Sequence, residues 1–226
     1  MRAAILLVLS ILLVGAAPES QDARDRQDMA DLSRHIARLR EAAEKKPQDA
    51  ASQYQLALAH SYLSEVALEL KDKNAARQSA EEGIKAAKRA VALSPTAAEH
   101  HRILGTLCGQ VIPANVLAGL KHGRCAMDSI GKAVELDPRS AEVWISRGVG
   151  NYYLPSSFGG GVELAIADFE KAIKLSPKSA DAHLWLGIAL RKAGRNADAH
   201  KALARAVELN PKRIWARQQL EKTPAK

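Results

Sequence analysis

Hydrophobic positions recur at the spacing of one helix face along most of the chain, in alanine-rich stretches interleaved with charged residues. Each stretch ends in a short turn that closes on proline; these are Pro47, Pro95, Pro138, Pro177 and Pro211. Proline stops a helix because it lacks the backbone N–H and disfavours the α region at the preceding residue. The prolines are 48, 43, 39 and 34 residues apart. The pattern therefore predicts successive helical hairpins.

A second pattern recurs inside these stretches. The last unit reads His183-x2-Leu186-Gly187-x2-Leu190, then Ala199-x3-Leu203-x2-Ala206. The unit before it reads Trp144-x2-Arg147-Gly148-x2-Asn151, then Ala165-x3-Phe169-x2-Ala172. Small residues at Gly187 and Ala199 would let the two helices of a hairpin approach closely. The spacing resembles the tetratricopeptide repeat family, which implies an all-α, right-handed α-solenoid of helix hairpins.

The resemblance divides the chain into a series of units. A TPR domain is expected over 24–222, after a short linker at 18–23 and before a disordered tail at 223–226. Within it we expect a half repeat at 24–47, full repeats at 48–95, 96–138, 139–177 and 178–211, and a closing helix at 212–222. The first three full repeats are longer than the family period. Their extra residues predict a longer hairpin in the first, and loops at Gly109–Gly123 and Leu154–Gly161 in the next two.

The first 17 residues predict a signal peptide. Arg2 precedes an apolar run that is shorter than a membrane span, and small residues for cleavage follow near Ala16 and Ala17. An uncleaved N-terminal anchor is the alternative. The chain is therefore expected to be exported, either secreted or periplasmic if its source is a Gram-negative bacterium.

Composition favours an interaction scaffold over an enzyme. Alanine accounts for 42 of 226 residues and aromatic residues for 4%, and the chain has no phosphate-binding loop and no hydrolase or metalloprotease motif. We therefore expect no catalytic residues, no metal and no cofactor.

The resemblance also implies a concave groove lined by the first helix of each repeat. This groove would bind a protein or peptide of unknown identity, because aromatic residues and arginine are common interface anchors. The expected groove residues are Tyr54, Leu58, Arg102, Thr106, Ile145, Val149, Tyr152, Tyr153, Leu184, Ile188, Arg191 and Trp215.

Positive charge concentrates at the C-terminal end. The net charge is +8, and the segment from Arg191 to Lys226 holds ten basic residues against three acidic ones. The expected basic patch comprises Arg195, Lys201, Arg205, Lys212, Arg213 and Arg217. An electrostatic adaptor that binds an anionic membrane surface or an acidic partner is the alternative function. Nucleic acid is not expected, since an exported protein seldom meets it.

The two cysteines fall on the first and second helices of one repeat. In an oxidising compartment Cys108 and Cys125 could form a disulfide, provided that their Cα atoms lie within about 7 Å. Two buried free thiols are the competing interpretation.

Overall fold

The computed structural model describes residues 16–114 and 118–225. This part of the chain is helical and contains no strand. Its α-helices are α1 (Ala16–Asp25), α2 (Met29–Lys45), α3 (Ala50–Glu69), α4 (Lys73–Leu93), α5 (Ala98–Val111), α6 (Ala118–Leu136), α7 (Ala141–Tyr153), α8 (Val162–Leu175), α9 (Ala180–Lys192), α10 (Asn196–Leu209) and α11 (Ile214–Glu221). Two short 3-10 helices are also present: η1 (Ile112–Ala114) follows α5, and η2 (Ser156–Phe158) lies between α7 and α8.

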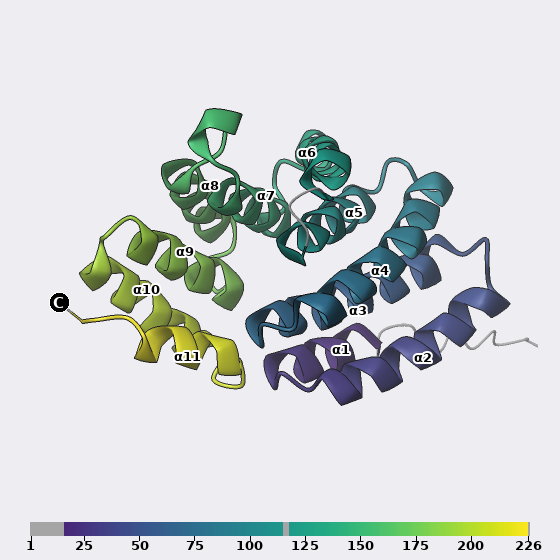
Figure 1. Ribbon diagram of the computed structural model, residues 1–226, viewed down its shortest axis with the longest axis horizontal. Coiled ribbons are helices and arrows are strands. Elements are labelled where there is room, and N and C mark those ends of the chain that lie inside the picture. Colours follow the sequence, from purple (N-terminus) through teal and green to yellow (C-terminus); the bar gives the residue numbers. More distant parts are fainter. Residues whose placement is uncertain (1–15, 115–117, 226) are drawn as a thin grey trace, which may run out of the picture.

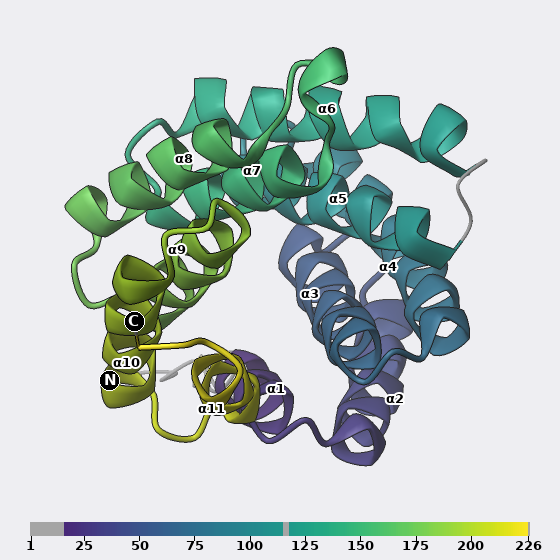
Figure 2. The ribbon, with the colours of Figure 1, turned by 60° about the vertical axis from the view of Figure 1, so that its left-hand side comes forward.

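The helices form an all-α solenoid of hairpins, as the sequence predicts. Helices α3, α5, α7 and α9 form an inner wall, and their hairpin partners α4, α6, α8 and α10 lie outside it (Figure 2). Helix α1 lies beside α11 at the open side of this wall (Figure 1). The two ends of the solenoid therefore meet, and the inner wall is nearly closed into a ring.

Local sequence sets the ends of these helices. The side chains of Asp49, Asp72, Ser140 and Ser179 each accept a hydrogen bond from a backbone N–H in the first turn of α3, α4, α7 and α9. Such caps satisfy donors that have no partner within the helix. At the other end, α2, α4, α6, α8 and α10 each stop two residues before a repeat proline.

A side-chain donor binds each of four repeat prolines. His101, Trp144 and His183 donate a ring N–H to the carbonyls of Pro95, Pro138 and Pro177 at 2.8, 2.8 and 3.1 Å. Arg217 donates a guanidinium N–H to the carbonyl of Pro211 at 2.8 Å. A carbonyl oxygen can only accept, so each histidine carries its proton on Nε2. In α5, α7 and α9 the aromatic position of the repeat motif is thus a donor position that joins the helix to the preceding turn.

Glycine allows close contact within the last two hairpins. A Cβ added at Gly148 would come within 2.5 Å of the Phe169 ring, and one at Gly187 within 2.5 Å of Leu203. It would also lie 3.0 Å from the carbonyl of Ala199, the residue expected to face Gly187. These glycines therefore permit the close helix approach that the sequence predicts.

Two expectations about the ends of the domain are wrong. Residues 18–23 do not form a linker, because they lie within α1, which is the first helix that the half repeat was expected to lack. Pro18 is compatible with this helix because it lies in the first turn, where backbone N–H groups have no helical partner. The tail is not disordered throughout, because Thr223 is buried and its hydroxyl donates to Gln219.

The longer repeats differ in how they use their extra residues. As expected, the first has the longest hairpin, with α3 turning into α4 at Leu70–Asp72. The expected loop at Gly109–Gly123 is mostly helical, because α5 and η1 extend to Ala114 and α6 begins at Ala118. The predicted signal peptide lies outside the described residues up to residue 15.

Candidate protein-binding groove

Four of the expected groove residues belong to the hydrophobic core. Leu58, Ile145, Leu184 and Ile188 are at most 7% exposed. They belong to the buried core clusters, so their side chains cannot be the free contact surface that the resemblance implied. This is a correction to the expected site.

The residues expected on α5 bind other residues of the inner wall. Arg102 donates to Glu99 at 2.8 Å and to Ser146 of α7 at 3.4 Å, and Thr106 donates to the same serine at 3.4 Å. Tyr54 of α3 donates to Glu99 at 3.2 Å. Burial alone would raise the pKa of Glu99, but Arg102 outweighs it and lowers that pKa. These contacts stiffen the wall.

Arg191 joins α9 to the end of the chain. Its guanidinium donates to the carbonyl and side-chain oxygens of Gln219 at 3.1 and 2.6 Å and to the Thr223 hydroxyl at 2.8 Å. Arg191 is therefore a structural contact rather than a free groove residue.

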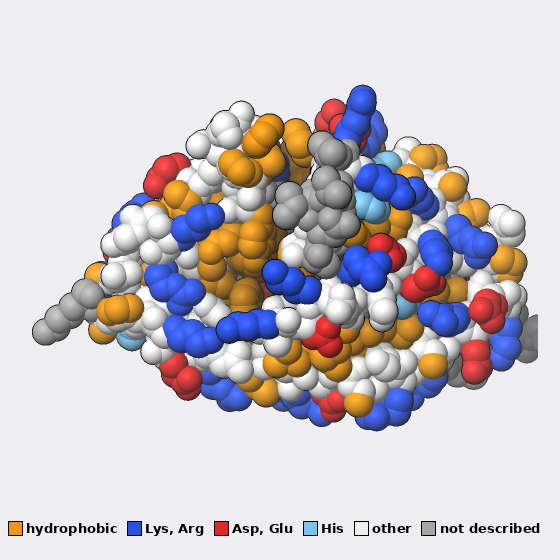
Figure 3. Space-filling model, in the orientation of Figure 1, with side chains coloured by type: hydrophobic (Ala, Val, Ile, Leu, Met, Phe, Trp, Pro, Cys, Tyr) orange, Lys and Arg blue, Asp and Glu red, His pale blue; other side chains and the backbone are white. Residues whose placement is uncertain are grey.

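Four aromatic side chains cluster on the inner wall, and we call them the aromatic hollow: Tyr152, Tyr153, Trp185 and Trp215. Trp185 lies at the centre, with its ring centroid 6.0 Å from Tyr152, 6.4 Å from Tyr153 and 5.3 Å from Trp215. Val149 packs against the adjoining core. Hydrophobic side chains line a visible hollow between α9 and the near end of α3 (Figure 3).

Tyr153 is the most accessible member of the aromatic hollow. Its side chain is 64% exposed, yet the protein atoms around it and the neighbouring Tyr152 raise its pKa to about 12. Glu65 and Glu69 of α3 add to this rise, because their negative charge disfavours the ionised form of the tyrosine. The exposed ring of Tyr153 therefore lies beside the rings of Tyr152 and Trp185.

Trp185 was missed because it follows His183, which already occupies the aromatic position of the repeat motif. A second large aromatic two residues later on the same helix is the signal that could have identified it.

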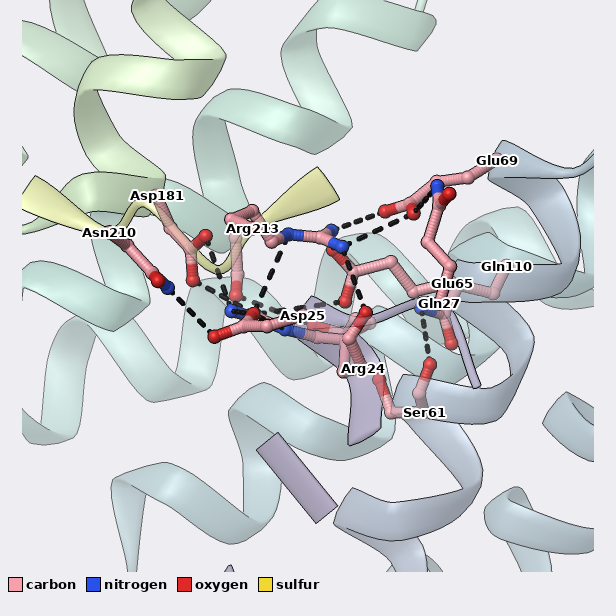
Figure 4. A network of polar contacts seen from close by, with 12 residues as sticks. Arg24, Asp25, Gln27, Ser61, Glu65, Glu69, Gln110, Asp181, Asn210 and Arg213 are labelled. Atoms are coloured by element: carbon pink, nitrogen blue, oxygen red, sulfur yellow. Dashed lines mark hydrogen bonds and ion pairs between the residues drawn. The ribbon is translucent and has the colours of Figure 1, made fainter. Parts of the chain in front are cut away.

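A buried ionic cluster joins the two ends of the solenoid (Figure 4), and we call it the closing network. Its members are Arg24, Asp25, Glu65, Glu69, Asp181, Asn210 and Arg213.

Two arginines hold the closing network together. Arg24 of α1 donates to Asp181 of α9 at 2.9 Å. Burial alone would raise the pKa of Asp181, but Arg24 and Arg213 together outweigh it and lower that pKa. Arg213 precedes α11, is 1% exposed and binds Glu65 at 2.8 Å as well as Glu69. Burial raises the pKa of Glu69 to about 7, with Glu65 adding to the rise.

The closing network corrects the expected basic patch, since Arg213 is buried and cannot present charge to a partner. Acidic neighbours also partly neutralise the charge of several other residues of the expected basic patch. Lys212 pairs with Asp22 at 3.1 Å, and Arg205 with Glu208 at 2.6 Å. Arg195 and Lys201 lie 3.4 and 4.0 Å from Asp198, while Arg217 binds the Pro211 carbonyl.

The structure joins Cys108 of α5 and Cys125 of α6 in a disulfide. Their Cα atoms lie 6.0 Å apart, and the bridge spans 17 positions in sequence. It links the two helices of the second full repeat near the segment that connects them.

Neither a metal-ligand cluster nor a membrane-spanning helix is present among the described residues. They contain no group of three or more His, Cys, Asp or Glu side chains arranged to hold a metal ion. None of their helices combines the length and apolar composition needed to cross a bilayer.

Comparisons with known proteins agree with the fold. A family model described as regulator of microtubule dynamics protein 1-3 matches residues 19–156, and a tetratricopeptide repeat model matches residues 159–214. Small glutamine-rich tetratricopeptide repeat-containing protein 2 of Mycosarcoma maydis is 32% identical over 97 residues, which are 43% of this chain and 26% of that protein. The chain thus matches about a quarter of that relative's length.

Solved structures share the same architecture. The thermophilic TPR protein TTC0263 of Thermus thermophilus is 20% identical with a TM-score of 0.65, covering 85% of this chain and 90% of that one. The HusA haemophore of Porphyromonas gingivalis is 15% identical with a TM-score of 0.58, covering 80% of this chain and 96% of that one. These likenesses show the tetratricopeptide fold.

Proposed function

Since this chain belongs to the family described as regulator of microtubule dynamics protein 1-3 and carries tetratricopeptide repeats, we propose that it binds a protein segment in its concave groove. Tetratricopeptide proteins are generally protein–protein interaction scaffolds without catalytic activity. The observation that carries the proposal is the aromatic hollow, where Tyr153 is 64% exposed within a concave wall. Large aromatic side chains in such positions are frequent anchors of binding energy.

The test compares proteins captured by the wild-type chain with those captured by a Tyr153→Ala, Trp185→Ala double variant. Phe158→Ala is the matched control, because Phe158 is 72% exposed but lies in η2, outside the aromatic hollow. We expect specific partners to be lost from the double variant and retained by the control. Unchanged partners in all three samples would contradict groove binding, provided that circular dichroism shows the same fold.

We also propose that the chain is exported by its first 17 residues. The Cys108–Cys125 disulfide supports this, because disulfides persist in oxidising compartments and are rare in the cytosol. Mass spectrometry of the protein from its native source should find a new N-terminus near Ala16 or Ala17 and no alkylatable thiol without reduction. An intact Met1 together with two free thiols would contradict export.

A further inference from the structure

The first helices carry an acidic side chain at matching positions. Glu99, Glu142 and Asp181 each lie two residues before the donor that binds the repeat proline. Glu99 pairs with Arg102, and Asp181 pairs with Arg24. Glu142 lies between them on α7 and has no ion pair in the described part of the chain.

Glu142 is exposed to solvent but lies within the concave wall. The surrounding protein atoms raise its pKa, and Asp181 and Glu99 add to the rise against the opposing effects of Arg102 and Arg24. A cation bound beside Glu142 would relieve this unfavourable environment. The groove therefore offers a local acidic position in a protein whose overall charge is +8.

The chain's own ends show which chemistry this wall binds. Arg24 from α1 lies 5.1 Å from the centroid of the Tyr62 ring while its guanidinium bonds Asp181. Arg213 lies 5.5 Å from the centroid of the Trp215 ring while it bonds carboxylates of α3. In both cases a guanidinium combines a charge-assisted hydrogen bond with an aromatic face.

The acidic position and the aromatic hollow lie at opposite ends of α7. Glu142 and Tyr153 are eleven residues apart, which corresponds to about 16 Å along a helix that rises about 1.5 Å per residue. An extended chain rises about 3.3 Å per residue, so roughly five residues span this distance. One short peptide could therefore contact both.

From this charge complementarity we propose that the groove binds an extended peptide with an arginine or lysine opposite Glu142 and an aromatic or aliphatic side chain in the aromatic hollow. The two side chains are about five residues apart. This inference rests on the proposed function and specifies the partner's chemistry. The basic side chain bonds Glu142, and the apolar side chain packs against Tyr153 and Trp185.

The experiment uses the full chain to select from a random peptide library displayed on phage. Enriched sequences are then synthesised with blocked ends, and their affinities are measured by fluorescence anisotropy. We expect the sequences to share a basic and an apolar residue at this spacing. Glu142→Gln and Tyr153→Ala should each weaken binding about tenfold or more. Glu170→Gln, which removes an exposed carboxylate from α8, and Phe158→Ala should leave affinity unchanged.

The alternative outcomes separate the two proposals. Enrichment of acidic or uncharged peptides, or binding that is lost in Tyr153→Ala but unchanged in Glu142→Gln, would overturn the basic partner and retain the groove. Binding that neither variant alters would overturn both proposals. Self-association that disappears in Tyr153→Ala, measured by light scattering, would identify a second copy as the occupant and overturn the peptide proposal.

Discussion

The indole Nε1 of Trp144 donates a 2.8 Å hydrogen bond to the carbonyl of Pro138, the proline that ends the preceding repeat. The same link recurs in two repeats through histidine, and at the closing helix through arginine. The position accepts different side chains because the shared requirement is an N–H donor that reaches six residues back. This explains why a histidine can replace the tryptophan of the repeat motif.

Trp144→Phe should therefore destabilise the protein even though the replacement remains aromatic. Loss of the donor should lower the free energy of unfolding by about 1 kcal/mol, with a further contribution from lost packing. Trp185→Phe is the control, because the Trp185 indole has no hydrogen bond among the described residues but also packs against aromatic neighbours. Urea unfolding should show the larger loss for Trp144→Phe. Equal losses would mean that packing alone explains the effect.

Two glycines of α7 should respond to alanine in opposite directions. Gly148→Ala should lower the free energy of unfolding by about 1–3 kcal/mol, because the new Cβ would come within 2.5 Å of the Phe169 ring. At Gly150 an added Cβ would meet no described atom within 4 Å. Gly150→Ala should thus stabilise the protein by about 0.5–1 kcal/mol, since alanine favours helix. Thermal unfolding of both variants checks the sign, and destabilisation by Gly150→Ala would contradict this account.

The repeat hairpins could be predicted because their signals are local and periodic. Prolines mark the turns, and Gly148 and Gly187 mark the close contacts between helices. The expected groove was less accurate, because a helix position in a motif does not show how deeply its side chain is buried. Ile188 occupies a groove position of the motif but is only 5% exposed.

Ring closure could not be predicted from local pattern. Arg24 and Asp181 are 157 positions apart, and Arg213 and Glu69 are 144 apart. Neither pair repeats, so no periodic signal connects its members. The arginine that looked like part of a surface patch is buried because distant carboxylates surround it.

Arg213→Met should be one of the most damaging substitutions in the chain. It removes the cation between Glu65 and Glu69 and should lower the free energy of unfolding by about 3–5 kcal/mol, as expected when one partner of a buried ion pair is lost. Adding Glu69→Gln should recover part of this loss, because it removes a carboxylate left without its partner. Arg205→Met, which breaks the surface pair with Glu208, should change stability by less than about 1 kcal/mol. Similar losses for both single variants in urea unfolding would contradict a special role for the closing network.

His60 should make the protein sensitive to acid. Burial lowers its pKa to about 4, and because Ser79 donates its own hydroxyl hydrogen to the His60 carbonyl, it can only accept from the ring Nδ1. In the unfolded chain the neutral ring takes up a second proton near pH 6.5, whereas in the folded protein it does so only near pH 4. The free energy of unfolding therefore falls by roughly 3 kcal/mol as the pH drops from above 6.5 toward 4. Urea unfolding across this range should show a weaker acid dependence for His60→Gln. His183→Gln should retain the wild-type slope, and an unchanged slope in His60→Gln would assign the acid sensitivity to other groups.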